Sequence, residues 1–151
     1  MIQTRPLFKI QVQVPSSMDL GHTPLGARRV AMVGTGSFEG ERVRGTVLPG
    51  PNGDWLLQRN DGVMVLDVRL TLETDDGAYI HMRYNGLRHG PADVMAKVAR
   101  GEPVDPKSYY FRITPTFETS SEKYAWMNKI LAVGIGERNA SGPKYDIFEI
   151  L

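Results

Sequence analysis

The sequence predicts an all-β protein, an antiparallel β-barrel of about eight or nine strands with one short helix near residues 91–100. Apolar residues recur with a period of two along most of the chain, which is typical of half-buried strands. Gly, Pro and Asn-Asp-Gly turn signals separate these stretches at short intervals, as in sandwiches and barrels. The length of 151 residues fits a single barrel domain over residues 1–151, with a core large enough to fold by itself.

The predicted strands follow one another from the N-terminus. PLFKIQVQVP puts Phe8, Ile10, Val12 and Val14 on one face and the polar residues Lys9, Gln11 and Gln13 on the other. The other strand patterns are RRVAMVGTGSFEG, ERVRGTVLPG, GDWLLQRNDGVMVLDVRLTLE, AYIHMRYNG, YYFRITPTFET, YAWMNKILAVGIGE and KYDIFEIL. Residues 15–26, PSSMDLGHTPLG, are predicted to form a loop.

One segment, HGPADVMAKVARGEP, has helical spacing instead. Pro91 suits the first helical position, and Gly101 lies just past the last turn, where helices commonly end. Between them, an apolar stripe is made by Val94, Met95 and Val98. This short helix between strands is predicted to cover one end of the barrel.

The stretch LDVRLTLETDDGAYIHMRYNG is predicted to form a hairpin. A three-residue loop at 75–77, Asp-Asp-Gly, suits a type I turn whose glycine takes the left-handed position of a G1 bulge. This register sets Leu70 opposite Met82 and makes both faces chemically uniform, whereas a two-residue loop would mix them. It also sets Arg69 opposite Arg83, and like charges directly opposed destabilise a sheet.

The polar face of this hairpin allows two interpretations. It can be the solvated outer face of an antiparallel sheet, or it can line the inside of a barrel as a pocket for a polar ligand. The second interpretation accounts for the opposed arginines, because an anion or a carboxylate between them would relieve their repulsion. We therefore predict an enclosed pocket lined by Asp67, Arg69, His81, Arg83 and Arg112.

Composition and motifs exclude several classes of function. A net charge of +1 gives no basic field for nucleic acid, and no segment is long and apolar enough to span a membrane as a helix. The absence of Cys excludes disulfides, thiolate metal sites and a Cys nucleophile. The three histidines lack metal-ligand spacing, so neither a metal nor a cofactor is predicted. Neither a GxSxG elbow nor a GxGxxG phosphate loop is present.

Location and partners follow from the ends and edges of the chain. The N-terminal MIQTRPLFKIQVQVP lacks the continuous apolar run of a signal peptide, so a cytoplasmic location is expected. Exposed strand edges at Pro115 and at the C-terminal IFEIL predict a homodimer that covers them, which sedimentation at micromolar concentration would test. A small-molecule ligand is the other predicted partner.

Several motifs carry a resemblance to known proteins. They are FEG at 38–40, RGTVLPG at 44–50, DW at 54–55, DGVMVLDVRLTLETDDGAYI at 61–80, GEPVDPKSYYFRITPTFET at 101–119 and YAWMN at 124–128. Together they resemble the domain-of-unknown-function 3237 family over nearly the whole chain. The resemblance implies a single-domain antiparallel β-barrel. It implies no set of catalytic residues, because most members of that family have no assigned activity.

The predicted function is that of a cofactor-independent enzyme acting on a small oxygenated, phenolic or acidic metabolite. Its chemistry would be the proton transfer of a lyase, isomerase or dehydratase. The candidates for acid–base catalysis are Asp67, Glu39, His81 and Tyr110. The candidates for substrate binding are Arg69, Arg83, Arg112, Asn85, Trp55, Trp126 and Asn128, whose tryptophans would stack on a flat ring. Asp54, which precedes Trp55, is a further polar candidate.

Two other functions remain open. A lipocalin-like carrier or sensor would have a polar pocket without an enclosed, perturbed carboxylate. An interaction module would have a filled apolar barrel and polar faces that are merely solvated. The content of the barrel therefore separates the three hypotheses.

Overall fold

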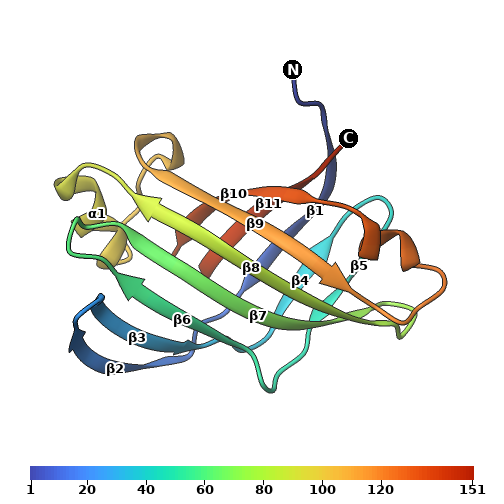
Figure 1. Cartoon of the computed structure of the whole chain (residues 1–151), viewed down its shortest axis with the longest axis horizontal. Helices are drawn as coiled ribbons and strands as arrows, with labels where there is room; N and C mark the ends of the chain where they lie inside the picture. The colour runs from blue at the N-terminus through green and yellow to red at the C-terminus, as the bar shows by residue number, and fades with distance from the viewer.

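Eleven antiparallel strands form one continuous sheet, and eight of them close into a barrel (Figure 1). The computed structural model describes all residues, 1–151. The strands are β1 (Thr4–Val12), β2 (Ser16–Thr23), β3 (Gly26–Met32), β4 (Gly36–Glu39), β5 (Arg44–Val47), β6 (Gly53–Gln58), β7 (Met64–Thr74), β8 (Tyr79–His89), β9 (Tyr110–Glu118), β10 (Ala132–Asn139) and β11 (Gly142–Ile150). Around the barrel the order is β7-β5-β4-β1-β11-β10-β9-β8, and β8 pairs back onto β7. The predicted barrel is therefore confirmed, with three strands beyond the eight that close it.

The three additional strands branch from β7. This strand pairs with β6 over its first half and with β5 only at its last three residues. β6 pairs in turn with β3, and β3 with β2. The sheet thus splits along β7, and the β6-β3-β2 branch lies toward the same end of the molecule as the helix α1 (Ala92–Ala99) (Figure 1).

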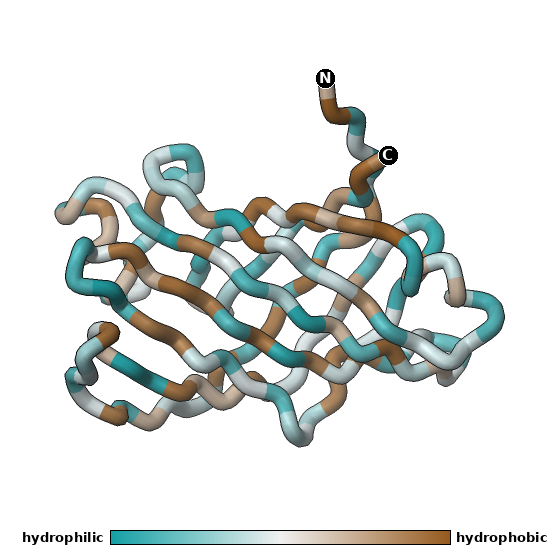
Figure 2. The backbone as a smooth tube through the Cα atoms, viewed as in Figure 1, coloured by the Kyte–Doolittle hydropathy of each residue, from teal (hydrophilic) through white to brown (hydrophobic).

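Apolar side chains line the inside of the barrel because each strand turns one of its two faces inward. Buried positions alternate with more exposed ones along the whole of β7 and β9. The largest fully buried side chains include Leu70, Met82, Tyr84 and Phe111. Figure 2 shows this alternation as hydrophobic and hydrophilic bands along the strands. An eight-stranded barrel is narrow enough for inward side chains to fill much of it.

The hairpin between β7 and β8 has the predicted register. Arg69 faces Arg83, and the neighbouring pairs follow in step. The Thr74 N–H donates a hydrogen bond to the Ala78 carbonyl oxygen at 2.8 Å, which closes the three-residue loop. Gly77 has a φ of 85°, the left-handed conformation expected of a G1 bulge.

We expect Gly77→Ala to lower the free energy of unfolding by about 1 kcal/mol or more. A Cβ at this position would meet no atom within 4 Å, so the cost comes from the positive φ alone. Urea denaturation measures it. Asp75→Ala, in the same loop at negative φ, is the control and should cost less. Equal stability of Gly77→Ala and the parent protein would contradict the strained turn.

One prediction about the fold is wrong, because residues 16–23 form strand β2 rather than part of a loop. β2 and β3 make an antiparallel hairpin that runs from the pair Ser16–Met32 to the pair Thr23–Gly26. Nearly all side chains of β2 are exposed, so neither of its faces has to be apolar. The alternation that reveals a half-buried strand is therefore missing from its sequence.

The predicted helix is confirmed as α1, which begins directly after Pro91 and buries Val98 against the core. It covers one end of the barrel. None of the helices is long and apolar enough to cross a membrane. The remaining helical segments are the short 3₁₀ helices η1 (Pro106–Ser108) and η2 (Ala125–Lys129), the second of which replaces the beginning of a predicted strand.

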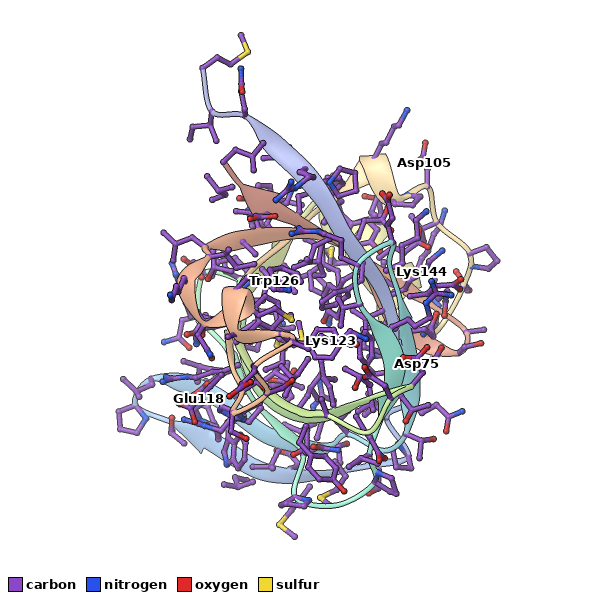
Figure 3. All side chains as sticks on the ribbon, turned by 90° about the vertical axis from the view of Figure 1, so that its right-hand side faces the viewer. Asp75, Asp105, Glu118, Lys123, Trp126 and Lys144 are labelled. Atoms are coloured by element: carbon purple, nitrogen blue, oxygen red, sulfur yellow. The ribbon has the colours of Figure 1, made fainter.

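The opposite end of the barrel is held together by polar contacts, and Figure 3 looks onto it. The Asp76 carboxylate accepts hydrogen bonds from Lys123 Nζ and from the Tyr124 hydroxyl at 2.9 Å. These contacts tie the β7–β8 turn to the segment that leads into η2. Led by the hydrogen bond from Lys123, they hold the pKa of the Asp76 carboxyl far below its ordinary value.

Candidate functional site

A cavity of about 480 Å³ lies at the end of the barrel that α1 covers, bounded by barrel strands and by the β6-β3-β2 branch. Its walls come from nine strands, β1 to β3 and β6 to β11, and from α1. Fourteen of its 25 lining residues are hydrophobic, among them Leu66 and Phe111 from the barrel and Met95 from the helix. Polar and charged groups line the rest of this space, and convergent polar groups beside an apolar wall are typical of a ligand site.

Asp54 projects into the cavity from β6 and is 8% exposed. β6 and β7 keep one register throughout, but the residues between the pairs Asp54–Val68 and Leu57–Val65 are not paired. In this gap the Asp67 N–H donates to Asp54 Oδ1 at 3.1 Å. The side chain of Asp54 therefore replaces a ladder hydrogen bond, and that contact fixes the position of the carboxyl group.

Burial raises the pKa of Asp54 to about 6 from an ordinary value of 3.8. The Asp67 N–H and the charges of Arg88 and Arg29 oppose this effect, while the Asp67 carboxylate adds to it. Desolvation wins because the carboxyl is buried and the arginines act on it only at a distance, without a hydrogen bond to it. Asp54 is therefore an acid whose ionisation falls close to neutral pH.

Arg88 approaches the cavity from β8, on the same inward row as Tyr84. Its guanidinium carbon lies 5.4 Å from the centre of the Phe111 ring. Its Nε is buried and has no hydrogen-bond acceptor in the chain. Burial lowers the pKa of Arg88, although the group remains a cation at neutral pH.

Tyr84 and Tyr145 form a pair of buried phenols in the cavity wall. Their hydroxyl oxygens lie 3.4 Å apart, and their rings meet edge to face at 5.3 Å. Burial raises the pKa of both hydroxyl groups, so both stay protonated at neutral pH. Asp54 and Tyr84 face the same residue of β7, Val68, from its two sides. The carboxyl and one phenol thus belong to one layer of the barrel.

Two more arginines line the cavity with exposed side chains. Arg29 lies on β3, next to Ala31 on the inward row, and Arg138 lies at the end of β10. The Arg138 N–H donates to the Tyr109 hydroxyl at 2.9 Å, which fixes the backbone there. The carboxylates and histidines of the chain form no group of three that could hold a metal ion.

The enclosed pocket predicted from the hairpin is wrong. Asp67 and Arg69 are half-buried and His81, Arg83 and Arg112 are exposed, all on the outside of the barrel. The apolar residues that alternate with them fill the inside, so the polar row has to face outward. Solvent then screens the opposed arginines. Catalytic and binding roles for this outer face stay predictions.

The other predicted residues are also outside the cavity. Glu39 is exposed on β4, Tyr110 stacks on His89 at 4.9 Å, and Asn85 donates to the Leu66 carbonyl oxygen. Trp55 is 40% exposed beneath the Arg69 guanidinium.

Two predicted binding residues, Trp126 and Asn128, lie in η2 at the opposite end (Figure 3). Trp126 stacks under Arg42 at 4.1 Å, and Asn128 exchanges two hydrogen bonds with the backbone of Thr119. These contacts stabilise that end of the barrel, so the structure does not bring the two residues together with Trp55.

Of the cavity residues, sequence reasoning identified only Asp54 as a polar candidate. Arg88 was detectable, because extending the hairpin register past Tyr84 sets it opposite Met64 on the apolar face. An arginine on an inward row is a signal for a buried polar site. Arg29 and Arg138 gave no such signal, because they reach the cavity from strands whose position depends on the closure of the barrel.

Comparison with known proteins finds similar chains of unassigned function. The family described as "Protein of unknown function (DUF3237)" matches residues 2–150. The UPF0311 protein RPA1785 of Rhodopseudomonas palustris is 35% identical over 150 residues, which cover 99% of this chain and 97% of that protein. Its crystal structure, of a "conserved protein of unknown function", has a TM-score of 0.95 at 34% identity and covers 100% and 99% of the two chains.

Two further solved structures share the architecture. A "beta-barrel like protein" of Acinetobacter baumannii is 40% identical with a TM-score of 0.87, covering 100% of this chain and 97% of that one. A Penicillium herquei protein described as "an enzyme" has a TM-score of 0.75, covering 99% and 95%. Its identity is 19%, so this last likeness concerns the fold alone.

Proposed function

The chain belongs to this family of proteins of unknown function, as its motifs indicated, and we propose that it is a cofactor-independent enzyme. It would move protons on a small oxygenated, acidic or phenolic metabolite bound in the cavity, as a lyase, isomerase or dehydratase does. One observation carries the proposal: a buried carboxyl with a pKa of about 6 projects into a cavity of about 480 Å³. A proton-transfer group works best when its pKa lies near the working pH.

The cavity residues divide the chemistry among them. Ionised Asp54 takes a proton from a C–H or O–H of the ligand. The negative charge that develops on the ligand oxygen is stabilised by a hydrogen bond from the Tyr84–Tyr145 pair. Protonated Asp54 then returns the proton, either to another carbon in an isomerisation or to a departing hydroxyl group, which leaves as water.

The content of the barrel favours this function over the two alternatives. A cavity of about 480 Å³ argues against an interaction module with a filled barrel. The perturbed carboxyl inside it argues against a simple carrier, because burying Asp54 has a free-energy cost that binding an uncharged ligand does not require. The enzyme from Penicillium herquei supports the proposal at the level of the barrel fold alone. The homodimer and the cytoplasmic location stay predictions.

The test is proton exchange in deuterated buffer. We expect the protein to exchange a C–H proton, or to eliminate water, in at least one member of a panel of small hydroxy acids and phenols followed by NMR. The rate should fall as the pH drops below about 6, because Asp54 then becomes protonated. Asp54→Asn should lower the rate by about 10²–10⁴-fold.

A matched variant decides which carboxylate acts. Asp67→Asn makes the same change on the outer face of the neighbouring strand. If Asp67→Asn lost the reaction while Asp54→Asn kept full activity, the base would be Asp67 on the outer face, and the proposal would be contradicted. Absence of exchange across the panel at every pH would count against the enzyme hypothesis itself.

A further inference from the structure

The cavity holds more positive charge than its own carboxylate balances. Arg29, Arg88 and Arg138 line it and form no salt bridge, whereas Arg100 at the rim pairs with Glu102 at 3.1 Å. Asp54 is the one carboxylate among the lining residues. The positive charges around the cavity repel one another, and an anion bound between them would offset the free-energy cost of this repulsion.

Arg88 is the least exposed of these three arginines. Its buried Nε–H has no acceptor in the chain, which is costly for a group that bears a positive charge. Arg88 pairs across the sheet with Phe111 of β9, and Arg138 stands on the far side of β9, on β10. The two guanidinium groups therefore flank one strand, and each repels the other.

The positive groups and the proton-transfer group lie in different layers of the barrel. Asp54 and Tyr84 both face Val68, whereas Arg88 faces Met64, four residues toward the α1 end. Four residues of extended strand span about 13 Å, and the long side chain of Arg88 covers part of that distance. A ligand that uses both ends must carry an anionic group several atoms away from the oxygen that reacts.

We propose that the cavity selects anionic ligands, holding a carboxylate or phosphate group on Arg88 and Arg138 near α1 while the reacting oxygen lies against Asp54 and the paired tyrosines. Arg29 on β3 contributes charge from the other side of the cavity. The substrate class that fits is a small aromatic or unsaturated acid with its oxygenated end opposite the acid group. This inference rests on the proposed function, because it takes the same cavity as the substrate site.

Matched ligands test the charge requirement by calorimetry. The probes are benzoate, 4-hydroxybenzoate and phenylacetate, each compared with its uncharged amide, and phenyl phosphate. We expect at least one acid to bind about tenfold or more tightly than its amide. Tighter binding of phenyl phosphate than of the carboxylates would assign the site to phosphate esters. No preference of any acid over its amide would overturn the proposal.

Variants locate the anion. Arg88→Met keeps most of the stem and removes the charge, so it should lower the affinity for the acid to that for the amide. Arg138→Met, at an exposed position, should weaken acid binding in the same direction. Arg44→Met, an exposed arginine on β5 outside the cavity, is the control and should bind as the parent does. Unchanged acid binding in both Arg88→Met and Arg138→Met would also overturn the proposal.

The two proposals fail in different ways. If acids bind in an Arg88-dependent manner but Asp54→Asn keeps the full exchange rate, the anion site stands and the catalytic role of Asp54 falls. If Asp54 proves essential while acids and amides bind equally, the catalytic role of Asp54 stands and the anion site falls. Circular dichroism of Arg88→Met confirms that a loss of binding comes from the missing charge and not from unfolding.

Discussion

Asp54→Asn is expected to make the protein more stable at pH 8, by up to about 3 kcal/mol, while removing the proposed proton-transfer group. The folded protein raises the pKa of Asp54 from 3.8 to about 6, so it binds this proton more readily than the unfolded chain does. Stability is therefore lost as the pH rises from about 4 to about 6, and the whole cost is present above that range. Asparagine has nearly the same shape, stays neutral, and can still accept the Asp67 N–H through Oδ1.

Thermal and urea unfolding at pH 4, 6 and 8 measure this effect. The gain in unfolding free energy from Asp54→Asn should be small at pH 4, where the Asp54 carboxyl of the parent is largely protonated in the folded state and partly protonated in the unfolded state. The gain should grow toward pH 8. Asp75→Asn, an exposed carboxylate at the opposite end, is the control and should give no such trend. The raised pKa would be contradicted if Asp54→Asn were less stable than the parent at pH 8, or if the difference in stability between the two proteins were the same at every pH.

Gly45→Ala is expected to lower the free energy of unfolding by about 3 kcal/mol or more, because the added Cβ would overlap the backbone of the neighbouring strand. Gly45 faces Thr74 across the seam between β5 and β7. An added Cβ would overlap the Glu73 carbonyl oxygen and lie 2.7 Å from Thr74 Cα. Neither is a flexible side chain, so the strands themselves must separate.

The size of this effect follows from the shortness of the seam. β5 and β7 share three residue pairs, and they close this side of the barrel where β7 leaves β6. Thr46→Ala, the next residue with an exposed side chain, is the control and should change stability by less than about 0.5 kcal/mol. Urea denaturation of both variants makes the comparison. Equal stability of Gly45→Ala and the parent would mean that the two strands do not approach closely in solution.

The raised pKa of Asp54 links stability to the proposed function. Keeping a carboxyl group where it is costly to ionise makes sense if the protein uses its proton, and such sites commonly lower stability. The structural role of Asp54 as acceptor for the Asp67 N–H does not need a charge, because an amide oxygen would serve as well. The increase in stability and the loss of proton transfer in one variant would therefore separate the two roles.

Local features of the chain determined the hairpin and the helix. The Asp-Asp-Gly loop specifies Gly77 at positive φ, and this loop alone sets the register that brings Arg69 opposite Arg83. Pro91 and Gly101 mark the limits of α1 because helix ends depend on a few neighbouring residues. The alternation along β7 and β9 predicted an all-β barrel, since a period of two follows from strand geometry.

Which face of the hairpin lies inside was decided by the closed barrel. Alternation divides a strand into two faces, and a barrel interior can in principle be polar, so the sequence allowed either orientation. Once eight strands close, the interior is narrow and the apolar row of Leu70, Met82 and Tyr84 is buried in it. The polar row with Asp67 is left outside. β2 likewise gave no signal, because it is exposed and is held by pairing with β3.

The candidate site itself depends on contacts between residues far apart in the chain. Asp54, Arg88 and Tyr145 come from β6, β8 and β11, and they meet because β7 carries β6 and β8 on its two sides while β11 closes the wall opposite. No local period encodes such a meeting. The sequence alone therefore determined most of the strands, the turn and the family, whereas only the tertiary structure decided where the sheet opens, which charges are enclosed and which carboxyl has its pKa raised.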